Sequence, residues 1–159
     1  MKVLIVYDSV YGNTEKIART IAEAFSQSDE VKVLRAVETN PQELESVDLL
    51  IVGSPTQAGR PVQTTKEFLG RIPANALGNC KVAAFDTRFT VQGRKLAMRI
   101  FLGMLGYAAG CIEKSLLGKG GHPVSPPEGF IVDDTRGPLK EGEVERAAEW
   151  AKGIMESVK

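Results

Sequence analysis

Residues 3–14 read VLIVYDSVYGNT and join a continuous apolar run to a short polar turn. The apolar run VLIVY is typical of a strand that is covered on both faces of a sheet. A helical pattern follows from about Thr14 to Ser26, with Ile17, Ile21 and Phe25 on one face. The stretch therefore predicts a strand, a turn and a helix, which is the start of a βαβ unit.

The same alternation continues to the end of the chain. We predict further strands at Val31–Ala36, Leu49–Gly53, Lys81–Asp86 and Cys111–Leu117, and a short strand in GFIV at residues 129–132. We predict a helical turn at residues 40–47, a short helix around Phe68 and Leu69, a helix at residues 93–105, and a long helix from about Glu141 to Val158. This order predicts an α/β fold with a doubly wound, five-stranded parallel sheet and helices on both faces, in a single domain over residues 1–159.

Charge and composition argue against several classes of protein. Lys+Arg and Asp+Glu each number 20, so the net charge is zero, which disfavours a nucleic-acid binder and the acidic face of many small electron carriers. No apolar run approaches the ~20 residues of a membrane helix, so we expect no membrane insertion. No signal-peptide cleavage pattern follows the first strand, and Cys80 and Cys111 lack C-x-x-C spacing. We therefore expect a cytoplasmic protein with two reduced thiols.

The polar turn at residues 8–14 has the composition of an anion site. It leads into a helix N-terminus, where free N–H groups and the helix dipole favour negative charge. Gly12 and Asn13 tolerate the backbone angles that turn N–H groups inward, and Ser9 and Thr14 add hydroxyl donors. The turn has neither the lysine of a P-loop nor a G-x-G-x-x-G pattern. We therefore expect it to hold a single terminal phosphate.

Two loops resemble those of the flavodoxin-like family. The sequence SVYGNT is similar to the family's phosphate loop [ST]-x-[ST]-G-x-T at Ser9, Gly12 and Thr14. Tyr11 departs from that pattern, and a Tyr-Gly pair here looks more like the flavodoxin-like NAD(P)H:quinone oxidoreductases. The loop GSPTQAG at residues 53–59 resembles the G-[ST]-P-T-x-x-G loop of those enzymes. The resemblance implies strand order 2-1-3-4-5 and non-covalently bound FMN at the carboxyl ends of the strands.

The resemblance also implies which residues would bind FMN. The phosphate would be held by Ser9, Val10, Tyr11, Gly12, Asn13 and Thr14. One side of the isoalloxazine ring would be covered by Pro55, Thr56, Gln57, Ala58 and Gly59, and the other side or the pyrimidine edge by Asp86, Thr87, Arg88 and Phe89.

The ring environment departs from the family in two respects. No aromatic residue lies between Ser54 and Thr65, so Phe89 and Tyr11 alone are available to cover the ring, and we expect an incomplete aromatic sandwich. Arg60 and Arg88 flank the two ring loops. Either one would stabilise the reduced, anionic flavin and raise its potential, which favours two-electron chemistry.

Other conspicuous residues have structural explanations. We expect Trp150 to be a packing residue of the last helix and His122 to lie in a solvated loop. No second His or Cys lies near His122 in the sequence, so we expect no metal site.

The resemblance favours an FMN-binding electron carrier that acts between redox partner proteins or on a small-molecule acceptor. The first alternative is a small FMN-dependent NAD(P)H:quinone-type oxidoreductase, and the second is a flavodoxin fold that has lost its cofactor. A phosphoacceptor receiver domain is disfavoured, because the first strand ends in a lone Asp8 and the third in Gly53.

Overall fold

The computed structural model describes residues 1–89 and 107–159. The strands are β1 (Lys2–Tyr7), β2 (Glu30–Arg35), β3 (Leu49–Pro55), β4 (Lys81–Phe89), β5 (His122–Pro123) and β6 (Glu128–Val132). The helices are α1 (Asn13–Glu23), α2 (Gln63–Arg71), α4 (Ala108–Gly118) and α5 (Glu143–Val158), with short 3-10 turns η1 (Ala36–Glu38) and η2 (Pro41–Leu44). The helix predicted at residues 93–105 lies outside the described residues.

The strands form one parallel sheet in the order β2-β1-β3-β4-β5, and β6 also pairs with β4. This confirms the expected order 2-1-3-4-5. The fifth position is shared, because β5 pairs with the start of β4 at Lys81 and Val82, and β6 pairs with its end from Phe85 to Phe89. The short strand expected in GFIV is therefore part of the main sheet.

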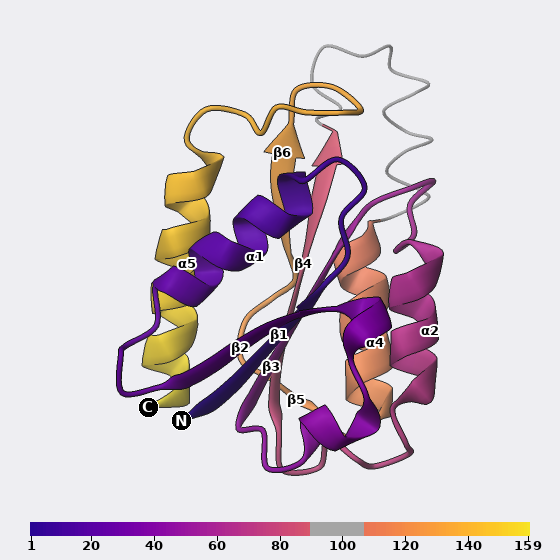
Figure 1. The fold of residues 1–159 in the computed structure, drawn as a ribbon, viewed down its shortest axis with the longest axis vertical. Coiled ribbons are helices and arrows are strands. Elements are labelled where there is room, and N and C mark those ends of the chain that lie inside the picture. Colours follow the sequence, from indigo (N-terminus) through magenta and orange to yellow (C-terminus); the bar gives the residue numbers. More distant parts are fainter. Residues whose placement is uncertain (90–106) are drawn as a thin grey trace.

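Helices cover both faces of the sheet, with α1 and α5 on one side and α2 and α4 on the other (Figure 1). The sheet residues alternate between the two layers: Ile5 and Ile51 pack toward α1 and α5, whereas Leu4 and Leu50 pack toward α2 and α4. Side chains alternate along a strand, so an apolar run such as VLIVY supplies both layers at once.

The strand predicted at Cys111–Leu117 is wrong, because these residues belong to α4. The fully buried residues of α4 are Ala108, Ala109, Ile112 and Leu116. Their spacing of three and four residues is helical, but the pattern is visible only when the window is extended toward residue 108. The strand that follows this helix in the sheet is divided between β5 and β6.

An aromatic cluster fills the layer between α5 and the sheet. Phe85, Phe130 and Trp150 meet edge to face, with ring centroids 6.0–6.1 Å apart. The indole N–H of Trp150 donates to the Ser125 hydroxyl at 3.0 Å. Trp150 is therefore a packing residue, as expected, and it is anchored by a hydrogen bond at its polar end.

The outer edge of β6 is bound to the first turn of α5 and to the loop before it. Ile131 donates its N–H to the Glu143 carboxylate at 2.7 Å and accepts from the Lys140 N–H at 2.9 Å. Gly129 donates its N–H to the Glu128 carboxylate at 2.9 Å, and its carbonyl accepts from Arg146. Burial alone would raise the pKa of Glu143, but hydrogen bonds from Arg146 and Ile131 outweigh it and hold that pKa below its usual value.

Candidate functional site

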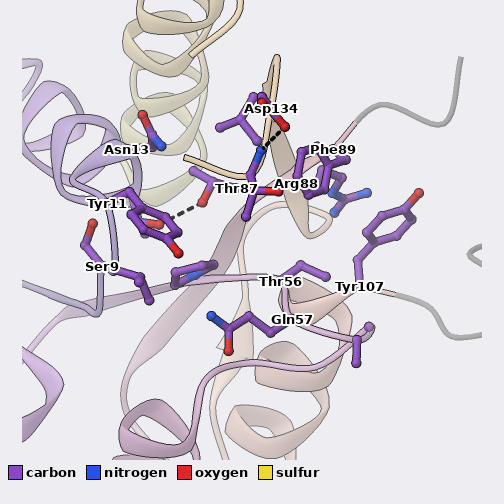
Figure 2. A pocket seen from close by; sticks show the side chains of 17 residues that line it. Ser9, Tyr11, Asn13, Thr56, Gln57, Thr87, Arg88, Phe89, Tyr107 and Asp134 are labelled. Atoms are coloured by element: carbon purple, nitrogen blue, oxygen red, sulfur yellow. Dashed lines mark hydrogen bonds between the residues drawn. The ribbon is translucent and has the colours of Figure 1, made fainter. Parts of the chain in front are cut away.

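A cavity of about 460 Å³ opens beyond the carboxyl ends of β1, β3, β4 and β6 (Figure 2). Its volume lies within the ~300–1,000 Å³ of typical small-molecule sites, and its place is the one where doubly wound sheets bind ligands. The expected residues that line it are Ser9, Val10, Tyr11, Asn13, Thr14, Pro55, Thr56, Gln57, Ala58, Gly59, Thr87, Arg88 and Phe89. Tyr107, Val132, Asp134 and Thr135 line it as well.

The turn before α1 forms one wall of the cavity. Gly12 stands at the N-cap position with φ 91°, and the Ser9 hydroxyl accepts its N–H at 3.0 Å. Among the described residues no side chain caps α1, so the first-turn N–H groups remain available to an anion. A Cβ on Gly12 would meet no described heavy atom within 4 Å. The glycine is therefore required by its left-handed backbone and not by lack of space.

Two arginines from other elements contact this turn. The Asn13 side chain donates to the Arg136 carbonyl at 3.2 Å, and the Arg136 guanidinium carbon lies 5.7 Å from the Tyr11 ring centroid. Arg35, at the end of β2, donates to the Ser9 carbonyl at 2.7 Å and lies 3.5 Å from the Asp8 carboxylate. The turn has no cation of its own in the sequence, but the fold brings two beside it.

Thr14 and Thr87 connect α1 to the end of β4. Their hydroxyl oxygens are 2.7 Å apart (Figure 2), and the two residues are 1% and 5% exposed. Both residues also line the cavity.

The loop after β3 closes with a two-residue turn. Gln57 and Arg60 exchange two backbone hydrogen bonds at 2.9 and 3.0 Å, and the central residues Ala58 and Gly59 have φ 49° and 75°. Positive φ at both central residues is the requirement of a type I′ turn, which strongly favours glycine or asparagine. Ala58 is therefore strained where the loop borders the cavity.

Replacing Ala58 by Gly is expected to raise the free energy of unfolding by about 0.5–1 kcal/mol, because relief of the left-handed strain exceeds the added entropy of the unfolded chain. Urea denaturation measures the change. The matched control is Ala148→Gly inside α5, which is expected to lose about 1 kcal/mol. Equal losses in the two variants would contradict the assigned strain.

Asp86 does not line the cavity, although we expect it beside the ligand. It is fully buried, and its carboxylate accepts two hydrogen bonds from Arg88 at 2.7 Å and one from the Ala109 N–H at 2.9 Å. Burial raises the pKa of Asp86 above its usual value, against the opposing effect of Arg88. Thr56 accepts the neighbouring Ala108 N–H at 3.0 Å. Asp86 and Thr56 together cap α4, which follows directly after Tyr107.

The two arginines expected near the ring behave differently from that expectation. The Arg88 guanidinium is paired with Asp86, and its carbon lies 3.6 Å from the centroid of the Tyr107 ring. Its positive charge is therefore largely neutralised beside the cavity. Arg60 does not line the cavity, and its Nη1 lies 4.0 Å from the Cys111 sulfur.

Sequence reasoning missed Tyr107 as an aromatic wall of the cavity. Tyr11 and Tyr107 stand on opposite sides of the opening in Figure 2. Tyr107 immediately precedes α4, so recognising that helix in the sequence would have placed it here. Val132 is the last residue of the short strand β6, and Asp134 and Thr135 follow it, so their position at the end of a predicted strand was the available signal.

Outside the cavity, His122 and the two cysteines are the other residues with reactive or metal-binding side chains that the sequence brought into question. His122 is exposed in β5, with its Nε2 2.8 Å from the Gly78 carbonyl, and both cysteines are free. Within residues 1–89 and 107–159, no three His, Cys, Asp or Glu residues are placed to share a metal ion. None of the helices in these ranges has the length and apolar character to cross a membrane.

Comparison with solved structures supports the fold. A flavodoxin from the domain Archaea superposes with a TM-score of 0.77 at 20% identity and covers 99% of both chains. Oxidised Flavodoxin 2 from Bacillus cereus superposes with a TM-score of 0.76 at 24% identity and covers 98% of this chain and 99% of that one.

Comparison of sequences identifies the family. An NAD(P)H dehydrogenase (quinone) from Acidovorax ebreus (strain TPSY) is 37% identical over an alignment of 117 residues, and the match covers 58% of this chain and 58% of that protein. The chain thus spans less than two thirds of that relative's length. The flavodoxin domain family model matches residues 4–106, which is more than half of the chain. The chain therefore belongs to the flavodoxin domain family.

Proposed function

We propose that this chain binds FMN non-covalently and passes electrons between redox partners. The observation that carries the proposal is the α1 N-terminus without a side-chain cap among the described residues, which opens into a cavity of ligand size. A phosphate there would meet free N–H groups and the positive end of the helix dipole.

The residues present fit FMN at both ends of the cavity. Ser9, Val10, Tyr11, Asn13 and Thr14, which line the cavity, and Gly12 at the N-cap of α1 would bind the phosphate through backbone N–H groups and short polar side chains. Tyr11, Phe89 and Tyr107 supply aromatic surface that would shield a flat ring from water. The three come from three different segments, so the aromatic cover is more complete than the sequence suggests.

Bound FMN would supply one-electron and two-electron chemistry, and the chain sets the charge around it. Arg88 contributes little free charge because Asp86 is bonded to it. Asp134 adds an exposed carboxylate at the rim of the cavity. This balance of charge does not stabilise a reduced, anionic flavin ring. It therefore favours a carrier with a low flavin potential, in place of the raised flavin potential that the sequence predicts from Arg88.

The first test is a visible spectrum of the purified protein, before and after FMN is added and excess is removed by desalting. Flavin bands near ~370 and ~450 nm that stay with the protein support the proposal, and a colourless protein overturns it. Gly12→Ala is expected to weaken FMN binding about tenfold, because alanine is strained at this φ. Gly153→Ala is the matched control, because it lies on the exposed face of α5, distant in sequence from the turn.

A second candidate is an FMN-dependent NAD(P)H:quinone oxidoreductase. The observation that favours it is the 37% identical relative, which is named an NAD(P)H dehydrogenase (quinone). Steady-state oxidation of NADPH or NADH by the FMN-loaded protein, with a soluble benzoquinone as acceptor, distinguishes the two. Turnover many times faster than free FMN supports the oxidoreductase, and a rate equal to free FMN supports the carrier.

A further inference from the structure

We propose that Thr87 makes this site selective for a terminal phosphate, because it orients the Thr14 hydroxyl so that its proton points to the bound anion. The inference rests on the proposed FMN function and assigns a role to a residue at the end of a strand, 73 positions away from its partner.

The hydrogen-bonding capacity of the two hydroxyls carries the argument. Each hydroxyl has one proton and two lone pairs. The 2.7 Å hydrogen bond between Thr14 and Thr87 uses one of the two protons. Neither hydroxyl has another partner among the described residues, and both residues are nearly inaccessible to solvent. The second proton is therefore available to a group in the cavity that both residues line.

The position of Thr14 decides the direction of the hydrogen bonds. Thr14 lies in the first turn of α1, beside the N–H groups that would hold a phosphate. Phosphate oxygens without protons only accept hydrogen bonds, so Thr14 must donate to the phosphate and accept from Thr87. The 2.7 Å pair allows either hydroxyl to donate, and a bound phosphate selects the arrangement in which Thr87 donates to Thr14.

The backbone of Thr87 is suited to such positioning. Thr87 lies in β4 between Pro55 of β3 and Phe130 of β6, and its carbonyl accepts the Thr56 N–H at 2.9 Å. A side chain on a strand that is paired on both sides is held more accurately than one on a loop. Its direction toward α1 follows from the alternation along β4, because Asp86 and Arg88 are bonded to each other on the opposite face.

FMN and riboflavin provide a direct test, because they share the ring and differ at the phosphate. Thr87→Val is expected to raise the dissociation constant of FMN about tenfold and to change that of riboflavin less than twofold. Thr87→Ser keeps the hydroxyl and is expected to restore most of the FMN affinity. Once Thr14 is replaced by Val, Thr87→Val is expected to weaken FMN binding no further. Flavin fluorescence measures each of these affinities.

Thr65→Val is the matched control. Thr65 is fully buried in α2, and its hydroxyl has no hydrogen-bond partner among the described residues. Its replacement is expected to leave the ratio of FMN to riboflavin affinity unchanged. If Thr87→Val weakens both flavins equally or neither, or if Ser fails to rescue, the inference is wrong and the FMN function stands. If the wild type binds neither flavin, the proposed function is wrong and the inference falls with it.

Discussion

Asp86→Ala is expected to lower the free energy of unfolding by about 3 kcal/mol. The change removes the acceptor of two Arg88 hydrogen bonds and of the Ala109 N–H. Breaking a buried ion pair from one side typically costs ~3–5 kcal/mol, and we expect the low end because Arg88 borders the cavity and keeps some contact with water. Urea denaturation at pH 7 measures the change through a lower midpoint at an unchanged m-value.

Two comparisons show whether the loss comes from unpaired groups. Replacing both partners, as in Asp86→Leu with Arg88→Met, is expected to recover a substantial part of the loss, because no charge is then left alone. Lys152→Ala breaks an exposed ion pair with Glu149 and is expected to change stability by less than ~0.5 kcal/mol. A loss below ~1 kcal/mol for Asp86→Ala would show that the hydrogen bonds of Asp86 to Arg88 and to the start of α4 contribute little to stability.

Gly53→Ala is expected to be the second strongest change, with a loss of about 1–3 kcal/mol and a larger loss for Gly53→Val. A Cβ at Gly53 would lie 2.0 Å from the Phe85 ring, which crosses directly over this glycine. Phe85 is fully buried and packs against Phe130 and Trp150, so the ring has little room to move. Thermal or urea unfolding gives the loss.

A compensating substitution tests the cause. The double variant Gly53→Ala with Phe85→Leu is expected to lose about 1 kcal/mol less than the sum of the two single losses, because the smaller side chain makes room for the new methyl group. Gly153→Ala, on the exposed face of α5, is expected to stabilise by up to ~1 kcal/mol instead. Simple additivity of the first pair would show that the ring contact is not the reason.

Local features of the sequence predicted most of this fold. VLIVY and the turn after it identify β1 and the start of α1, because the apolar run and the polar turn are complete within a dozen residues. The segment Cys111–Leu117 was misassigned as a strand because its seven residues are too few to distinguish a helical repeat from the alternation of a strand. The interruption between β5 and β6 has no periodic signal at all.

The site was harder to predict where it depends on distant residues. The phosphate turn is contiguous in sequence, so its residues could be recognised together. The pairing of Thr14 with Thr87 depends on how α1 packs on β4, and the cap that Asp86 places on Ala109 depends on where α4 begins. Neither relation leaves a pattern in the sequence, because each is created by packing between segments.

The hydrogen bonds along the outside of β6 also affect how this protein behaves at high concentration. An edge strand with free N–H and C=O groups is a template to which a strand from another molecule can add, and this leads to aggregation. In β6 the outward groups of Gly129 and Ile131 already have partners, Glu143 and Arg146 of α5 among them. The lowered pKa of Glu143 keeps its carboxylate ionised below the usual titration range, so its contribution is lost only as the pH falls through that lowered value. Acid strong enough to protonate Glu143 would weaken its hydrogen bond to the Ile131 N–H and its ion pair with Arg146, and so reduce the protection of this edge.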